Sequence, residues 1–291
     1  ALVRDPRVAL IAFTGSMHVG LDILHASAPA TPFGDARASF VPPHHVKRVV
    51  CEMGGKNAAI IDMSADLDEA VVGLRHSAFG FQGQKCSACS RIIVVDEAGE
   101  RGPAISNFIR RFVEATRSLT VGDPMLPGTD VGPVIDAEAQ AKILSYIDRG
   151  QKEGAKLELS LPVPAGLEER TGRKYVGPAI FSGVRESHAI WREEIFGPVV
   201  AIMHAPSFEA ALDLANASIY KLTGGVFSRK PSHIELAKKS FRVGNLYINR
   251  GITGALVARQ PFGGFGMSGI GSKAGGVDYL LQFTEPRACS E

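Results

Sequence analysis

With 291 residues, 45% of them hydrophobic, the chain has enough material for a substantial core and for two domains. Its 32 basic and 30 acidic residues nearly cancel and are scattered, which excludes a strong global field for nucleic acid or an anionic membrane and favours a small-molecule partner. Four cysteines are too few for a disulfide framework, no apolar run approaches the roughly 20 residues that span a bilayer, and the first residues resemble neither a signal nor a transit peptide. We therefore expect a cytoplasmic protein with no transmembrane segment.

Short apolar segments alternate with amphipathic helical segments along the chain. Apolar runs predict buried strands at residues 8–13, 58–62, 91–96, 199–204 and 245–249. Helical stripes lie between them, at residues 66–78, 105–116, 143–147 and 207–215. This alternation predicts an open, mostly parallel α/β sheet.

Local signals mark where these elements begin and end. Asp66 and Glu69 form a capping-box pair at the start of the first predicted helix, and Ser207 caps the last one. Residues 157–177 contain prolines and glycines that break the periodicity, so we expect a surface excursion there.

Cys86 is the candidate nucleophile. It lies in residues 81–91 (Phe-Gln-Gly-Gln-Lys-Cys-Ser-Ala-Cys-Ser-Arg), after a predicted helix and before a predicted strand. A connection of this kind can project a thiol into a cleft, where peptide N–H groups favour the thiolate. One alternative is a small buried hydrophobic residue. Another is a C-x-x-C redox or zinc pair with Cys89, but such redox pairs follow a strand and open a helix, and Cys51 and Cys289 complete no zinc site.

Glu52 is the candidate general base. It lies in residues 51–57 (Cys-Glu-Met-Gly-Gly-Lys-Asn), after apolar Val49 and Val50 and before two glycines that let a backbone approach a ligand. A partly desolvated carboxylate in this position has a pKa closer to neutrality, as a base that activates water requires. The alternative is a solvated surface glutamate.

Two segments have glycine patterns that occur in nucleotide sites. Residues 8–16 are typical of a strand, a tight turn and a helix start, where N–H groups near Gly15 and Ser16 can bind a pyrophosphate, although any βα turn has this pattern. Residues 264–269 satisfy G-x-G-x-x-G, but they follow a loop instead of a strand. We therefore do not assign them to a dinucleotide.

Five segments together resemble the signatures of the aldehyde dehydrogenase superfamily, in the family's order. They are residues 13–16, 51–57, 81–91, 194–198 (Glu-Ile-Phe-Gly-Pro) and 261–264 (Pro-Phe-Gly-Gly). The resemblance implies a three-layer α/β fold with an open, mostly parallel sheet. It also implies a partial Rossmann-like NAD-binding domain at residues 1–54, a catalytic domain at 55–267 and a return or oligomerisation segment at 268–291.

The resemblance also implies the cofactor and its contacts. The cofactor is NAD, and the residues expected to bind it are Gly15, Ser16, Gly54, Glu194 and Phe196. Glu194 would hold the nicotinamide ribose and Phe196 would pack beside the ring. Without the family, these two are a loop glutamate and a core phenylalanine. No metal is implied.

Residues 245–262 resemble one branch of the family more closely, the Δ1-pyrroline-5-carboxylate (L-glutamate γ-semialdehyde) dehydrogenases. In that branch, Gly254 and Ala255 would present N–H groups to the substrate α-carboxylate, Ser87 would add a hydroxyl and Phe262 would pack on the aliphatic chain. N–H and O–H donors recognise a carboxylate without needing a cation. Without the family, this segment is only a glycine-rich loop.

The activity that the resemblance implies is NAD-dependent oxidation of L-glutamate γ-semialdehyde to L-glutamate in proline catabolism. Cys86 would attack the aldehyde, and water activated by Glu52 would release the product. The match begins inside the cofactor domain, so we expect the chain to be the C-terminal half of a longer protein that also supplies the family's oxyanion-hole asparagine. A homo-oligomer, a proline dehydrogenase domain or partner, and the mitochondrial matrix in a eukaryote are further expectations. The alternatives are a dehydrogenase for another carboxylated aldehyde and a dehydrogenase-like module without activity.

Overall fold

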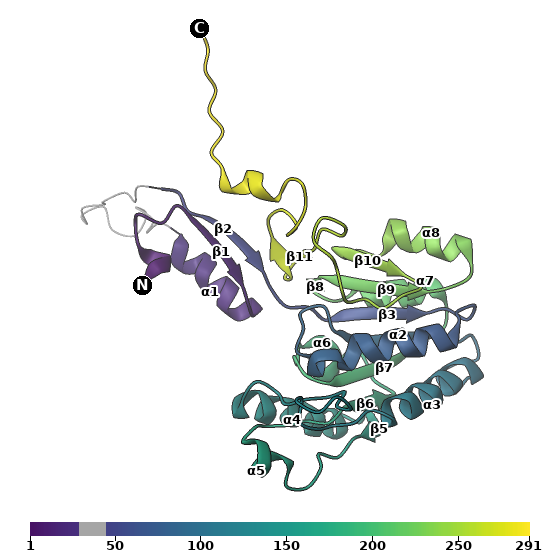
Figure 1. Ribbon diagram of the computed structural model, residues 1–291. Helices are drawn as coiled ribbons and strands as arrows, with labels where there is room; N and C mark the ends of the chain where they lie inside the picture. Colours follow the sequence, from purple (N-terminus) through teal and green to yellow (C-terminus); the bar gives the residue numbers. More distant parts are fainter. Residues whose placement is uncertain (29–44) are drawn as a thin grey trace. The chain divides into compact units, whose positions relative to one another are not determined.

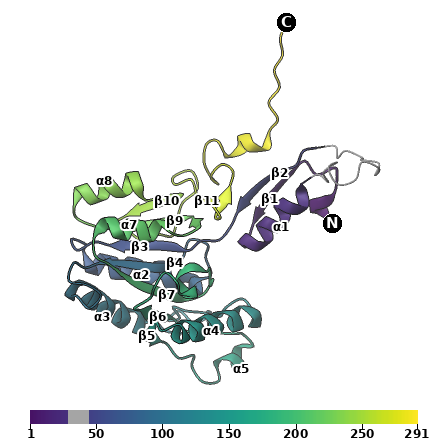
Figure 2. The same ribbon diagram turned by 180° about the vertical axis from the view of Figure 1, so that it is seen from behind.

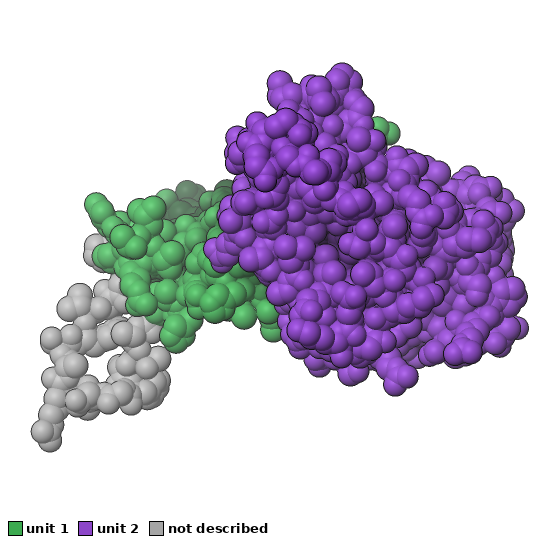
Figure 3. Space-filling model, turned by 90° about the horizontal axis from the view of Figure 1, so that it is seen from below, with its two compact units in different colours: residues 1–54, 255–291 green, residues 55–254 purple. Residues whose placement is uncertain are grey.

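The computed structural model describes residues 1–28 and 45–291 (Figure 1). The chain divides into two compact units, one made of residues 1–54 and 255–291 and the other of residues 55–254 (Figure 3). The three-part domain division expected from the sequence remains a prediction. No helix among the described residues has the length and apolar character that a bilayer span requires.

The unit of residues 55–254 is built on a seven-stranded sheet. In spatial order its strands are β10 (Asn245–Ile248), β9 (Thr223–Phe227), β3 (Asn57–Ile61), β4 (Cys89–Val95), β7 (Val199–Ala205), β6 (Ala179–Ser182) and β5 (Lys156–Ser160). All neighbours pair in parallel except β5, which is antiparallel to β6. The predicted open, mostly parallel α/β sheet is confirmed.

Helices cover both faces of this sheet (Figures 1 and 2). One face packs against α2 (Leu67–Phe79) and α3 (Pro103–Arg117). The other packs against α4 (Ala137–Lys152), α6 (Ala189–Arg192), α7 (Phe208–Asn216) and α8 (Pro231–Ser240). Successive residues of β3 and β4 enter opposite cores, which explains why these strands are continuous apolar runs in the sequence.

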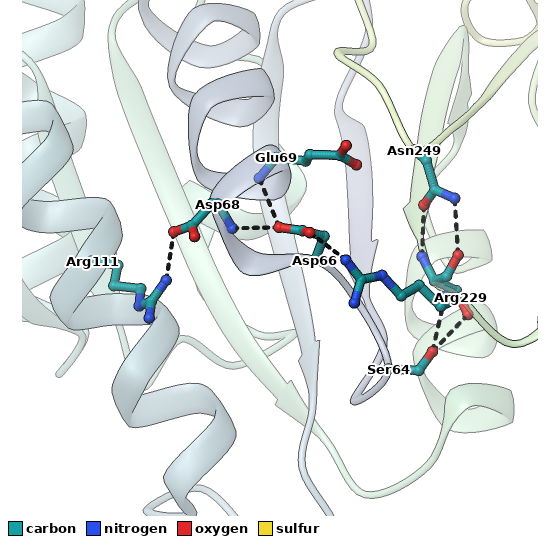
Figure 4. A network of polar contacts seen from close by, with 8 residues as sticks. Ser64, Asp66, Asp68, Glu69, Arg111, Arg229 and Asn249 are labelled. Atoms are coloured by element: carbon teal, nitrogen blue, oxygen red, sulfur yellow. Dashed lines mark hydrogen bonds and ion pairs between the residues drawn. The ribbon is translucent and has the colours of Figure 1, made fainter.

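The predicted strands are all present, with boundaries that differ by at most two residues. The predicted helix caps are present too. The Ser207 hydroxyl accepts a hydrogen bond from the Ala210 N–H at 3.1 Å. Asp66 accepts from the N–H groups of Asp68 at 3.0 Å and Glu69 at 3.2 Å, and it also pairs with Arg229 (Figure 4).

The surface excursion predicted for residues 157–177 is wrong in part. Strand β5 forms the edge of the sheet, α5 (Leu167–Thr171) follows it, and Leu167, Tyr175 and Val176 are buried. The prolines at 162 and 164 lie between β5 and α5, where a missing N–H interrupts no strand pairing. The prolines therefore interrupt the sequence pattern after β5, but they do not disrupt the strand itself.

In the other unit, β1 (Leu10–Thr14) runs parallel to β2 (Arg48–Glu52), and β12 (Gly269–Ile270) pairs antiparallel with β2. Helix α1 (Met17–Ser27) follows β1 directly, as the strand–turn–helix prediction required. Residues 264–269 span β11 (Phe265–Gly266), a turn and the start of β12. No helix begins there, which supports leaving this glycine pattern unassigned. The 3₁₀ helices of the chain are η1 (Leu2–Arg4), η2 (Gly80–Gly83) and η3 (Tyr279–Phe283).

Candidate active site

Cys86 lies in the connection between η2 and β4, and its side chain is partly buried. A helical segment therefore precedes Cys86 and a strand follows it, as the sequence predicted. All four cysteines lie in the described part of the chain, and none of them is in a disulfide. Cys89 is buried, and this burial raises the pKa of its thiol to about 12. A thiol of that kind is unsuited to redox exchange near neutral pH, which argues against the C-x-x-C alternative.

The turn that precedes Cys86 has unusual backbone geometry. Phe81 and Gln82 have φ angles of 57° and 56°, and Gly83 follows with 64°. A Cβ on Gly83 would lie 2.4 Å from the Gly197 carbonyl oxygen, so no larger residue fits there. Non-glycine residues in the left-handed region cost roughly 1–3 kcal/mol each and persist where the surrounding structure holds them, often at functional sites.

Asn57, at the start of β3, holds the other side of this turn. Its side-chain amide donates to the carbonyls of Cys86 and Ala88, both at 2.8 Å, and its side-chain oxygen accepts from the Thr223 N–H at 3.0 Å. The side chain is buried, so its hydrogen-bonding groups meet protein partners instead of solvent. Sequence reasoning gave Asn57 no role, although it closes the same motif as Glu52.

Gly55 connects the Cys86 turn with Glu194. Its N–H donates to Glu194 Oε1 at 2.8 Å, and a Cβ at position 55 would lie 2.5 Å from the Cys86 carbonyl oxygen. Burial raises the pKa of Glu194, while the Gly55 hydrogen bond and the charges of Lys142 and Lys56 oppose that rise. One carboxylate oxygen is therefore held by the backbone, and the other can accept hydrogen bonds from a polyol.

A small cavity joins these groups. Its lining includes Gly55, Lys85, Glu194 and Phe196. Phe196 has a φ of 59°, and 42% of its surface is exposed, so a large aromatic ring is presented at the surface by a strained backbone. Lys85 is partly buried; burial lowers the pKa of its ammonium, and the charge of Cys86 opposes that shift. The structure thus brings Glu194, Phe196 and the Cys86 turn together.

Ser87, Gly254, Ala255 and Phe262 are the residues that we expect to contact the substrate. Ser87 is buried, and its carbonyl accepts from the Thr223 hydroxyl at 3.4 Å. Gly254 is exposed with a φ of 84° and has open space where a Cβ would lie. Ala255 and Phe262 belong to the other unit and are partly buried. Their role toward a substrate remains a prediction.

Glu52 ends strand β2, where its carbonyl accepts from the Gly15 N–H at 3.0 Å. The partial burial predicted for its side chain is present and raises the pKa to about 7, while the charge of Lys273 opposes the rise. A Cβ on Gly263 would lie 2.7 Å from Glu52 Oε1, so only glycine leaves this carboxylate its space. Lys273 and Gly263 are far from Glu52 in sequence, and no local pattern marks them as its neighbours.

The start of α1 has the features of an anion site. Ser16 is the N-cap, and its hydroxyl accepts from the Val19 N–H at 3.3 Å. The first turn contains no acidic residue, so no carboxylate of this turn neutralises the positive end of the helix dipole. Gly15 and Ser16 are exposed at this end, whereas Gly54 is buried. These residues fit a phosphate group.

A larger cavity of about 640 Å³ lies elsewhere in the unit of residues 55–254. Its lining includes Arg101, Glu114, Glu158 and His204. Glu158 is paired with Lys156 at 3.0 Å and accepts from the Ser182 hydroxyl at 2.5 Å. None of the candidate site residues lines this cavity, so its size alone does not make it the site.

The chain belongs to the aldehyde dehydrogenase family, whose sequence profile matches residues 1–289. It is similar to the 1-pyrroline-5-carboxylate dehydrogenase of Geobacillus thermodenitrificans, with 44% identity over 292 residues that cover 100% of this chain and 52% of that protein. The chain therefore spans about half the length of the curated relatives it matches.

Two solved structures have the same fold. Proline utilization A from Bdellovibrio bacteriovorus is 48% identical with a TM-score of 0.87, and the match covers 98% of this chain and 28% of that one. A 1-pyrroline-5-carboxylate dehydrogenase from Thermus with bound NAD is 43% identical with a TM-score of 0.83, covering 98% of this chain and 51% of that one. The predicted aldehyde dehydrogenase fold is confirmed.

Proposed function

We propose that this chain carries the nucleophile, the general base and the substrate loop of an NAD-dependent L-glutamate γ-semialdehyde dehydrogenase that acts in proline catabolism. The observation that carries the proposal is the Cys86 turn, which Asn57 holds by two hydrogen bonds and which Gly55 connects to Glu194. Similarity at 44% to 48% identity to a 1-pyrroline-5-carboxylate dehydrogenase and to a proline utilization A supports the choice of substrate.

In the proposed reaction, Cys86 Sγ attacks the aldehyde carbon and forms a thiohemiacetal. When bound, NAD would supply the acceptor for the hydride that leaves the thiohemiacetal carbon, and loss of the hydroxyl proton would complete the conversion to a thioester. Glu52 then takes a proton from water, whose oxygen attacks the thioester carbon and releases L-glutamate and the Cys86 thiol. The Glu52 pKa of about 7 suits this step, because the carboxylate is available as a base near neutral pH.

The cofactor would be held by Gly15, Ser16, Gly54, Glu194 and Phe196. Ser16 caps the N-terminus of α1, whose first turn carries no acidic residue and would bind the pyrophosphate. Gly15, whose own N–H is bonded to the Glu52 carbonyl, and Gly54 have no side chain that would obstruct the cofactor. Glu194 would accept hydrogen bonds from the nicotinamide ribose, and the exposed Phe196 ring would pack beside the nicotinamide.

The substrate would be recognised through its α-carboxylate. Gly254 has the open space and the left-handed backbone that let N–H groups converge on an anion, and Ala255 follows it directly. Ser87 would add a hydroxyl and Phe262 an apolar contact. The further proposals are a homo-oligomer in the cytoplasm and a proline dehydrogenase activity in the same chain or in a partner, for which the similarity to proline utilization A is the support.

The test is NADH formation by the purified protein that contains this chain, with L-glutamate γ-semialdehyde and an aldehyde of equal length that lacks the α-carboxylate. The proposal expects turnover of the semialdehyde, weaker turnover of the second aldehyde, and no turnover after Cys86→Ser. Equal turnover of both aldehydes would favour a general aldehyde dehydrogenase. A folded wild-type protein without turnover would make the chain a dehydrogenase-like module.

A further inference from the structure

The connection between α6 and β7, residues 193–198, presents Glu194 and Phe196 without being a helix or a strand itself. Phe196 has a φ of 59°, in the left-handed region, where a residue with a side chain persists only when its surroundings hold it. The Gly55 N–H holds the Glu194 carboxylate at 2.8 Å, but this bond fixes only the end of the side chain. The backbone of the connection must therefore be held by other contacts.

One face of α4 supplies these contacts. Ile143, Tyr146 and Gly150 are spaced by three and four residues, so they share a face of the helix. At one end of this face, a Cβ on Gly197 would lie 2.5 Å from Ile143 Cγ1, so the connection lies directly on the buried Ile143 side chain. At the other end, a Cβ on Gly150 would lie 3.1 Å from Ile190 Cδ1 in α6. The helix therefore contacts the chain both before the connection and within it.

Between these two packing contacts, the Tyr146 hydroxyl donates a hydrogen bond to Glu193 Oε2 at 2.6 Å. Burial raises the pKa of Tyr146 to about 12, and the hydrogen bond to Glu193 adds to the rise, so the hydroxyl keeps its proton for this bond near neutral pH. A hydrogen bond to an ionised acceptor is roughly twice as strong as a neutral one. Arg149 also pairs with Glu193, at 3.4 Å, but the two side chains are 48% and 41% exposed, and exposed ion pairs contribute little. Tyr146 is therefore the main anchor of the Glu193 side chain.

Glu193 has no part in the proposed reaction, but it directly precedes Glu194 in the chain. We propose that Tyr146 is a positioning residue, which holds Glu193 on α4 and thereby fixes the backbone that directs the Glu194 carboxylate toward the ribose of a nicotinamide dinucleotide. This inference rests on the proposed function for the identity of the ligand. Loss of the Tyr146 hydroxyl should leave Glu194 chemically intact but less accurately placed.

A double-mutant cycle on the whole protein tests this role, with the dissociation constant for NAD as the readout. We expect Tyr146→Phe to weaken NAD binding roughly fivefold when Glu194 is present and to change it less than about twofold in a Glu194→Gln background. Tyr175→Phe is the matched control, because the Tyr175 hydroxyl is also buried but has no hydrogen-bond partner among the described residues. It should leave NAD binding unchanged in either background. An equal loss for Tyr146→Phe in both backgrounds, or no loss, would overturn the inference.

A second readout needs no cofactor. Hydrogen–deuterium exchange of the Gly55 amide in the ligand-free protein reports its bond to Glu194, and Glu194→Ala gives the exchange rate after complete loss of that bond. Tyr146→Phe should speed the exchange, and Glu193→Gln should speed it less, because an amide oxygen can still accept from the Tyr146 hydroxyl. Unchanged exchange in Tyr146→Phe would overturn the inference.

The two readouts separate this inference from the proposed function. Faster Gly55 exchange in a Tyr146→Phe protein whose wild type binds no NAD would reject the proposed function and leave the positioning of Glu194 by Tyr146 standing. Thermal unfolding of each variant checks that the fold is intact.

Discussion

The Asn57 side-chain amide donates to the Cys86 carbonyl at 2.8 Å, so the turn that carries the candidate nucleophile is tied to the first residue of β3. The same amide donates to the Ala88 carbonyl, and its oxygen accepts from the Thr223 N–H at the start of β9. Two neighbouring strands of the sheet thereby fix the backbone on both sides of Cys86. Rigid elements of this kind position a catalytic side chain more accurately than a loop alone.

Asn57→Leu should therefore lower both stability and Cys86 reactivity. It leaves buried backbone groups without partners, at a cost of about 1–3 kcal/mol each. The measurements are the free energy of unfolding and the alkylation rate of Cys86. Asn216 is the matched control, because its side chain donates to the Ser240 carbonyl at 2.9 Å and accepts from the Arg242 N–H at 2.8 Å. Asn216→Leu should lose stability without slowing the alkylation, and an equal slowing in both variants would contradict the positioning role.

Gly83→Ala should destabilise the protein more than Gly172→Ala does. Both glycines have a φ of 64°, so an alanine pays a similar backbone penalty of roughly 1–2 kcal/mol at either position. Only at position 83 does the new Cβ meet a backbone oxygen, at 2.4 Å, whereas position 172 has nothing within 4 Å. The difference between the two free energies of unfolding isolates the clash, and equal values would show that the turn before Cys86 relaxes freely.

Glu52 should make stability fall as the pH rises from about 4.5 to about 7. Its pKa is 4.5 in the ordinary environment and about 7 in the folded protein, so within this window the folded state holds a proton that the unfolded state has lost. The stabilisation is complete below the lower value and is lost as the pH passes the upper one. Denaturant unfolding across this range should show a weaker decline for Glu52→Gln. Glu69→Gln, at an exposed carboxylate, should leave the decline as it is in the wild type.

The same titration predicts the pH dependence of the proposed hydrolysis step. Because only the carboxylate can take a proton from water, the rate of thioester release should rise with pH and level off above about 7. Lys273→Met removes a charge that lowers this pKa, so it should move the profile to higher pH. Stopped-flow measurement of product release after acylation would follow this step, and a flat profile would exclude Glu52 as the base.

The features that could be predicted from the sequence are determined by residues that lie close together along the chain. The apolar runs of β3 and β4, the caps at Asp66 and Ser207, and the helix-to-strand context of Cys86 are of this kind. The contacts that complete the candidate site are not. Asn57 bonds to Thr223, Gly55 bonds to Glu194, and Glu52 is affected by the charge of Lys273. The two residues of each pair are far apart in sequence and come close only in the folded chain. Strand β5 was not predicted, because the prolines that follow it made the segment resemble a surface loop.

Competitive alkylation of the four thiols shows whether Cys86 is the reactive nucleophile. Mass spectrometry after brief treatment with iodoacetamide near neutral pH gives each cysteine its own rate. Cys51 and Cys89 are buried, whereas Cys289 is exposed and serves as the control for access alone. We expect Cys86 to react faster than Cys289 even though Cys86 is only partly exposed, and a Cys86 rate equal to or below that of Cys289 would show that Cys86 is not an activated nucleophile.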